Sequence, residues 1–120
     1  MRKPSKKTLK ARADKLFSAF IRAEGKCEWC GATNDTLQCA HVFTRSYNIT
    51  RFEPINAVCL CAKCHWRWHK EPVEAAEWIK EYLGDAVYDD LRFKAKNRVD
   101  KIDLNQIVTD LQEGNPPYVR

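Results

Sequence analysis

The chain has 120 residues, of which 44% are hydrophobic and 31% are charged. This composition is typical of one small folded domain with a modest core, and it excludes fibrous and disordered chains. No apolar segment approaches the roughly 20 residues of a membrane span, and no secretory signal follows the basic N-terminus. We therefore expect a single domain over residues 1–120, without a membrane partner, in a reducing cytoplasm. There, clustered cysteines are more often metal ligands than disulfides.

The net charge of +5 is distributed unevenly along the chain. Residues 1–26 carry nine Lys and Arg against two acids, residues 27–70 carry five against three, and residues 71–120 carry seven against eleven. A basic N-terminal arm suits a polyanionic partner such as nucleic acid, because each neutralised phosphate releases a counterion. A solvated basic helix face would give the same pattern.

The N-terminal segment is predicted to be a basic helix over residues 8–26, preceded by an unstructured start over residues 1–7. Thr8 is a suitable cap for its beginning and Gly25 for its end. Apolar side chains recur at three- and four-residue spacing and predict one buried stripe: Leu9, Ala13, Leu16, Phe17, Phe20 and Ile21.

The central segment, residues 27–70, is predicted to be a strand–loop–strand–helix unit. It holds all six cysteines and all three histidines of the chain. Residues 37–43 and 56–60 have the pattern of two short strands, and a helix follows Cys61 and runs through His65 and His69. The sequence thus predicts an α+β fold, in which a small ββα unit is flanked by an N-terminal basic helix and by C-terminal helices.

The C-terminal segment, residues 71–113, is predicted to form three helices that serve as scaffold or partner surface. Pro72 and Gly84 frame the first, residues 85–98 form the second, and Asp103 with Gln106 resembles a capping box that opens the third. The residues expected to face inward are Val73, Ala76, Ile79, Tyr82, Leu83, Val87, Tyr88, Leu91, Ala95, Leu104, Ile107, Val108 and Leu111. Residues 114–120 are expected to be a frayed tail.

Two Cys-x-x-Cys pairs predict a structural zinc site formed by Cys27, Cys30, Cys61 and Cys64. A two-residue gap lets one turn present two thiolates to one ion, and Zn²⁺ takes four such ligands in a tetrahedron. A closed site of four cysteines has no open position, so this zinc would stabilise the fold without taking part in chemistry. Cys39 and Cys59 are interpreted as small buried hydrophobes on the strands. Cys59 stays an alternative to Cys61, because the two share a strand face.

The three histidines and Asn56 form a second group of candidate site residues. His65 and His69 are four residues apart, so on a helix they share one face and can bind one ion together. His41 ends one predicted strand and Asn56 begins the next. The Asn56 side chain is therefore expected to hydrogen-bond one imidazole nitrogen of His41, which leaves the other nitrogen able to accept a proton.

The order His41, Asn56, His65, His69, with the run Asn56-Ala-Val-Cys-Leu-Cys61-x-x-Cys64-His65, resembles the HNH (His-Me finger, ββα-metal) nuclease family. The two cysteine pairs resemble its zinc-bearing branch. Over residues 20–84 the wider pattern resembles small phage-encoded HNH proteins, including the NinG-type recombination proteins. The resemblance implies a zinc-stapled ββα-metal unit acting in a bacterial or phage-infected cell.

The resemblance also implies an endonuclease that hydrolyses DNA phosphodiesters to 5′-phosphate and 3′-hydroxyl ends, in phage recombination or DNA processing. His41 would be the general base and Asn56 would orient it. His65, helped by His69, would hold a catalytic divalent cation, Mg²⁺, Mn²⁺ or Ni²⁺. Plausible phosphate contacts are Arg45, Arg51, Lys63 and Arg67.

Ala40 departs from the family pattern, because many HNH enzymes place a metal-binding Asp, Glu or His immediately before the base. The ion would then be held by His65, His69 and phosphate alone, or with a contribution from Asn56 or Cys39. The alternative function is a noncatalytic zinc module that binds nucleic acid or a protein. Nothing in the sequence discriminates DNA from RNA as the substrate.

Overall fold

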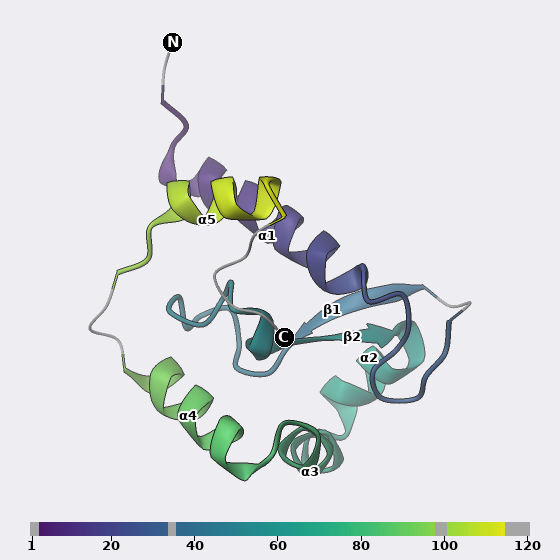
Figure 1. Ribbon diagram of the computed structural model, residues 1–120. Helices are drawn as coiled ribbons and strands as arrows, with labels where there is room; N and C mark the ends of the chain where they lie inside the picture. The colour runs from purple at the N-terminus through teal and green to yellow at the C-terminus, as the bar shows by residue number, and fades with distance from the viewer. Residues whose placement is uncertain (1–2, 34–35, 98–100, 115–120) are drawn as a thin grey trace.

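The computed structural model describes residues 3–33, 36–97 and 101–114. Its fold is α+β, with helices on both sides of a two-stranded antiparallel sheet (Figure 1). No helix in these residues has both the length and the apolar character that crossing a bilayer requires. In chain order the elements are α1 (Lys6–Arg22), β1 (Leu37–His41), the 3₁₀ turn η1 (Pro54–Asn56), β2 (Ala57–Cys61), α2 (Ala62–Lys70), α3 (Pro72–Leu83), α4 (Asp85–Lys96) and α5 (Leu104–Gln112).

Helix α1 begins and ends earlier than predicted. Ser5 is its N-cap, and the Ser5 Oγ accepts a hydrogen bond of 3.1 Å from the backbone N–H of Thr8. Thr8 therefore lies inside the helix. Residues 1–2 of the predicted unstructured start lie outside the described residues. The predicted apolar stripe is confirmed, since Ala13, Phe17 and Ile21 are buried.

The sheet separates two groups of buried side chains. Strands β1 and β2 pair with Cys39 opposite Cys59 and His41 opposite Ala57. On one face Ala57 and Cys59 pack against α1 and α5, and on the other Val58 and Leu60 pack with the zinc-candidate cysteines and with Ile79 of α3. Every residue of β2 is buried, which accounts for its continuous apolar run.

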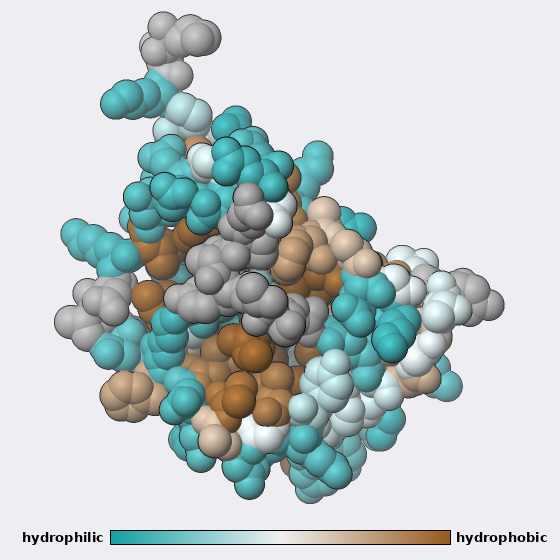
Figure 2. Space-filling view, in the orientation of Figure 1, coloured by the Kyte–Doolittle hydropathy of each residue, from teal (hydrophilic) through white to brown (hydrophobic). Residues whose placement is uncertain are grey.

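The loop between the strands lies in the middle of the molecule, within a ring formed by α1, α5, α4, α3 and α2 (Figure 1). Its end is well packed: Thr50, Phe52 and Glu53 are buried, and Lys94 of α4 forms an ion pair with Glu53. Figure 2 shows that apolar residues gather in the centre of this face, whereas hydrophilic side chains cover α1 and α5. The ring of helices thus fixes the loop that follows β1.

The C-terminal helices are confirmed as elements, but not all of their predicted inward residues are buried. Val73, Tyr82 and Val87 are 64%, 49% and 40% exposed. The buried residues of α3 are Ala75 and Ile79, and Val73 projects about 160° around the helix from Ala75 at 100° per residue.

The predicted boundary residues Gly84 and Asp103 are confirmed. Gly84 ends α3 with a φ of 87°, a backbone angle that favours glycine. The Asp103 side chain caps α5 by accepting the backbone N–H of Gln106 at 3.1 Å. Of the predicted tail, residues 115–120 lie outside the described residues.

Candidate metal centres and active site

Four cysteine sulfurs come together at the start of α2. The Sγ atoms of Cys27, Cys30, Cys61 and Cys64 all lie within 4.8 Å of one another, and those of Cys30 and Cys61 are 3.7 Å apart. Four sulfurs held tetrahedrally at about 2.3 Å from a Zn²⁺ ion are about 3.8 Å apart. The donor set and the spacing are therefore compatible with zinc.

Backbone N–H groups stabilise negative charge on two of the sulfurs. The backbone N–H of Cys30 donates to the Cys27 Sγ and that of Cys64 donates to the Cys61 Sγ, each at 3.4 Å. Burial by itself would raise the pKa of Cys27, but hydrogen bonds from Cys30, Cys61 and Trp29 outweigh it and lower that pKa to about 7. Burial raises the pKa values of Cys61 and Cys64, and the side chains of Cys27 and Cys30 add to both rises. One thiolate therefore forms readily, whereas a cation is needed to hold all four.

Cys59 is not part of the cluster, which settles the alternative that the sequence left open. Cys59 packs on the α1 side of the sheet, whereas Cys61 packs on the other side with Leu60. Strand alternation ends at Cys61 because this residue is the N-cap of α2, so the chain has already turned toward the helix.

A cavity of about 410 Å³ lies next to β1 and brings the three histidines together. It is lined by Asp14, Ser18, Cys39, His41, Thr44, Arg45, His65 and His69. The histidines come from two elements, the end of β1 and one face of α2, and α1 closes the cavity from a third side. The site thus combines residues from three separate parts of the chain.

The geometry of His65 and His69 is compatible with a pair of metal ligands. Their Nε2 atoms are 3.2 Å apart, about the separation of two imidazole nitrogens that each lie about 2.1 Å from one ion. The Gln38 Oε1 lies 2.5 Å from the His65 Nδ1. Because an amide oxygen only accepts, Nδ1 carries the proton, and the lone pair of the His65 Nε2 is directed at the His69 Nε2. Burial, and then the charge of His69, lower the pKa of His65, which favours the neutral form that binds metals.

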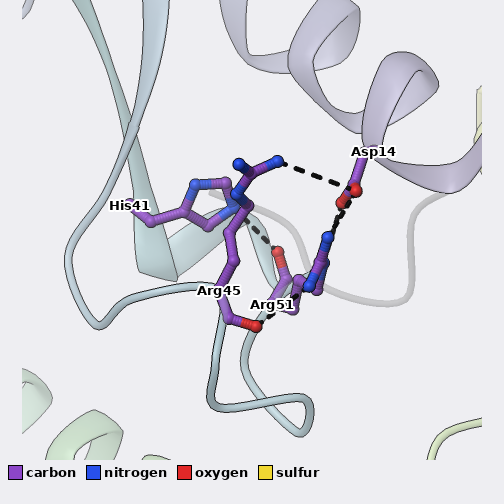
Figure 3. Close-up of polar contacts among 4 residues, drawn as sticks. All are labelled: Asp14, His41, Arg45 and Arg51. Atoms are coloured by element: carbon purple, nitrogen blue, oxygen red, sulfur yellow. Dashed lines mark hydrogen bonds and ion pairs between the residues drawn. The ribbon is translucent and has the colours of Figure 1, made fainter. Parts of the chain in front are cut away.

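His41 is held in one tautomer by the backbone of the loop. Its Nε2 lies 3.0 Å from the carbonyl oxygen of Arg51 (Figure 3). A carbonyl oxygen only accepts, so Nε2 carries the proton and Nδ1 is the basic nitrogen. Burial is the largest influence on the pKa of His41 and lowers it; the carbonyl of Arg51 acts in the opposite direction. His41 is therefore neutral near pH 7.

The Asn56 side chain hydrogen-bonds the backbone and not the imidazole, so the predicted hydrogen bond between Asn56 and His41 is wrong. Its Oδ1 accepts from the backbone N–H of Phe43 at 2.8 Å, and its Nδ2 donates to the carbonyl of Phe43 at 2.9 Å. The fully buried side chain thus ties the start of β2 to the residues just after His41. Both ends of its amide have hydrogen-bond partners there, and Asn56 does not line the cavity that holds the three histidines.

The four predicted phosphate contacts differ in their surroundings. Arg45 lines the cavity with 59% of its side chain exposed, and Lys63 is exposed on the first turn of α2. Arg67 pairs with Glu71 at 2.6 Å and lies over the Trp29 ring at 4.6 Å. Arg51 is only 15% exposed and all three of its guanidinium nitrogens donate within the protein. These contacts give Arg51 a structural role within the protein, and its contact with phosphate stays a prediction.

Two site residues have no counterpart in the sequence-based prediction. Gln38 fixes the tautomer of His65, and Asp14 of α1 reaches the loop that holds His41. Asp14 is the only acidic residue in the basic helix Lys6–Arg22, and that isolation is the one signal that points to it in the sequence.

Residues 27–72 match the family model described as HNH endonuclease. No curated protein and no solved structure matches the chain. The matched segment contains the cysteine cluster, His41, Asn56 and the His65–His69 pair, whereas Asp14 and Ser18 lie outside it. The centre of the chain is therefore similar to HNH endonuclease domains over residues 27–72, and it contains a four-cysteine cluster.

Proposed function

We propose that the protein is a metal-dependent endonuclease that hydrolyses phosphodiester bonds of DNA. The observation that carries the proposal is the cavity in which a neutral His41 with a basic Nδ1 accompanies two imidazoles set for one cation. A module that only binds nucleic acid has no need for this combination. The finer setting, recombination or DNA processing in the cytoplasm of a bacterial or phage-infected cell, rests on the resemblance over residues 20–84.

His41 is the general base of the proposed reaction. Its Nδ1 takes a proton from water while the water oxygen forms a bond to phosphorus and the bond from phosphorus to the 3′-oxygen breaks. The products are a 5′-phosphate and a 3′-hydroxyl, the latter protonated from solvent. The Nε2–H bond to Arg51 keeps the ring in place as positive charge develops on it.

His65 and His69 would hold the divalent cation in this proposal. When bound, it supplies Lewis-acid stabilisation of the negative charge that develops on the phosphate and on the leaving oxygen. Among the described residues no third His, Cys, Asp or Glu donor completes a cluster with these two histidines, and Ala40 faces the core with 2% exposure. This favours an ion held by the two histidines together with substrate phosphate, and it predicts tighter metal binding when DNA is present. Arg45 supplies an exposed positive charge beside them.

The test is conversion of supercoiled plasmid to open circles with Mg²⁺, Mn²⁺ or Ni²⁺, with a chelator control and a variant carrying both His65→Ala and His69→Ala. Nicking that needs the ion and is lost in the double variant supports the proposal. DNA binding without nicking by the wild-type chain contradicts it and favours the zinc-stapled binding module. A labelled RNA hairpin in the same assay tests RNA as the substrate.

Gln38→Leu is expected to weaken divalent-metal binding about 10- to 100-fold, as is typical when the partner of a metal-binding histidine is removed. Leucine keeps the bulk of the side chain but leaves the His65 Nδ1–H without its acceptor, so the tautomer with a basic Nε2 is no longer selected. Isothermal titration with Ni²⁺ or Mn²⁺ measures the effect. Gln106→Leu, an exposed glutamine of α5, is the matched control; equal affinity in both variants would contradict the role of Gln38.

A further inference from the structure

Helix α1 places one carboxylate against the loop that holds His41. Asp14 accepts two hydrogen bonds from Arg51, from Nε at 2.8 Å and from Nη2 at 2.5 Å, and lies 3.8 Å from a guanidinium nitrogen of Arg45 (Figure 3). The contact spans 37 residues of sequence and joins α1 to a loop inside the segment 27–72. It therefore crosses the boundary of the family match.

Arg51, the residue that Asp14 binds, also orients His41. The side chain of Arg51 binds Asp14, and its backbone carbonyl accepts from the His41 Nε2 at 3.0 Å. The remaining guanidinium nitrogen, Nη1, donates to the backbone carbonyl of Arg45 at 3.1 Å, which links two parts of the loop that lie six residues apart. A shift of the Arg51 side chain would move the carbonyl on which the tautomer of His41 depends.

The ion pair between Asp14 and Arg51 is shielded from water, and aromatic side chains pack beside it. The side chains of Arg51 and Asp14 are 15% and 22% exposed, so this pair is screened less than an exposed one. One turn further along α1, Phe17 contacts the His41 ring with centroids 5.6 Å apart and meets Phe52 edge-on. Helix α1 thus holds two consecutive loop residues, 51 and 52, and one face of the imidazole.

We propose that Asp14 is a positioning residue for His41, acting through Arg51, so that the catalytic unit extends beyond the family segment to helix α1. The inference rests on the proposed function, because it assigns His41 as the base. By engaging Arg51 with two hydrogen bonds and Arg45 only through a longer contact, Asp14 leaves Arg45 available for the substrate phosphate.

The direct test measures the tautomer of His41 without any reaction. Long-range ¹H–¹⁵N correlation spectra of the zinc-loaded chain distinguish a protonated from an unprotonated ring nitrogen, and the chain has only three histidines to assign. The wild-type chain is expected to show His41 with Nε2 protonated. In Asp14→Ala and Arg51→Ala this single tautomer is expected to be lost, although both variants keep the backbone carbonyl of residue 51. Asp14→Asn, which keeps the shape of the side chain, is the variant to use where Asp14→Ala does not fold.

Asp103→Ala is the matched control, because it removes a carboxylate that caps α5 and lowers stability without removing a hydrogen bond or ion pair of Arg51 or His41. An unchanged His41 tautomer in the Asp14 variants, or an equal change in Asp103→Ala, would overturn the proposal. In the nicking assay Asp14→Ala and Arg51→Ala are each expected to lower kcat about 10- to 100-fold with little change in KM. The double variant is expected to lose no more than Arg51→Ala alone, since the two residues act as one unit; additive losses would also overturn it.

The two measurements separate failure of this inference from failure of the proposed function. A wild-type chain that does not nick DNA contradicts the proposed function, while the tautomer spectra still decide whether Asp14 positions His41.

Discussion

Replacing Cys61 with Ser is expected to remove the bound zinc and to abolish cooperative unfolding of the protein. Cys61 is 2% exposed, joins β2 to α2, and its Sγ accepts the backbone N–H of Cys64. Binding of structural zinc is worth about 10–16 kcal/mol in small zinc domains, whereas a whole domain is stable by about 5–15 kcal/mol. Because Cys27, Cys61 and Cys64 form much of the core on that side of the sheet, its remaining apolar contacts do not replace the metal.

Zinc content per chain and a thermal melt followed by circular dichroism measure this effect. The wild-type chain is expected to hold one zinc and to lose its unfolding transition when a strong chelator removes it. Cys59→Ala is the control: Cys59 is equally buried but lies outside the cluster, so this variant should keep its zinc and lose about 1 kcal/mol of stability. A Cys61→Ser chain with full zinc and an unchanged Tm would contradict the assignment.

Local patterns predicted most of the elements, because helices and strands depend on spacing and on caps within a few residues. The α1 stripe, the buried run of β2 and the Asp103 cap all follow from such patterns. The start of α1 was misplaced because two residues close in sequence are both suitable N-caps. Ser5 and Thr8 are both suitable caps, and only the folded chain shows that Ser5 is used. The exposure of Val73 depends on which face of α3 meets the rest of the protein.

Candidate site residues could be predicted where the ligands of one site lie within a few residues of each other in the sequence. The Cys-x-x-Cys pairs and the four-residue step from His65 to His69 fix which side chains share a turn, and the structure brings both groups together. The partners of Asn56 and Arg51 were not predictable in this way. Asn56 bonds the backbone of residue 43, and Arg51 pairs with a carboxylate 37 residues earlier. Such contacts depend on tertiary packing, which no local pattern carries.

His41→Ala is expected to lower the rate of metal-dependent nicking about 10²- to 10⁴-fold, the usual contribution of a general base. DNA and metal binding should change little, because His41 shares no hydrogen bond with His65 or His69. The nicking rate at saturating metal measures the loss, with Asn105→Ala on the exposed side of α5 as the control. Added imidazole should restore part of the activity by occupying the space that the ring leaves. Full activity in His41→Ala would contradict the assignment of the base.

The pH dependence of nicking provides a separate check on His41. Burial, together with the charges of Arg45 and Arg51, lowers its pKa below the ordinary 6.5, although the Arg51 carbonyl and Asp14 oppose the shift. The acid limb of kcat/KM at saturating metal should therefore have its midpoint below pH 6.5.

The lowered pKa of His41 also makes folding stability depend on pH. The unfolded chain binds the proton more tightly than the folded chain, so the contribution of His41 to stability is present above pH 6.5 and is lost as pH falls through the folded pKa. His41→Ala lacks this contribution, so its Tm should fall less than that of the wild-type chain between about pH 7.5 and about pH 5, a range that spans the ordinary histidine pKa. A midpoint above 6.5, or equal losses of Tm, would show that the imidazole is not held in its neutral form.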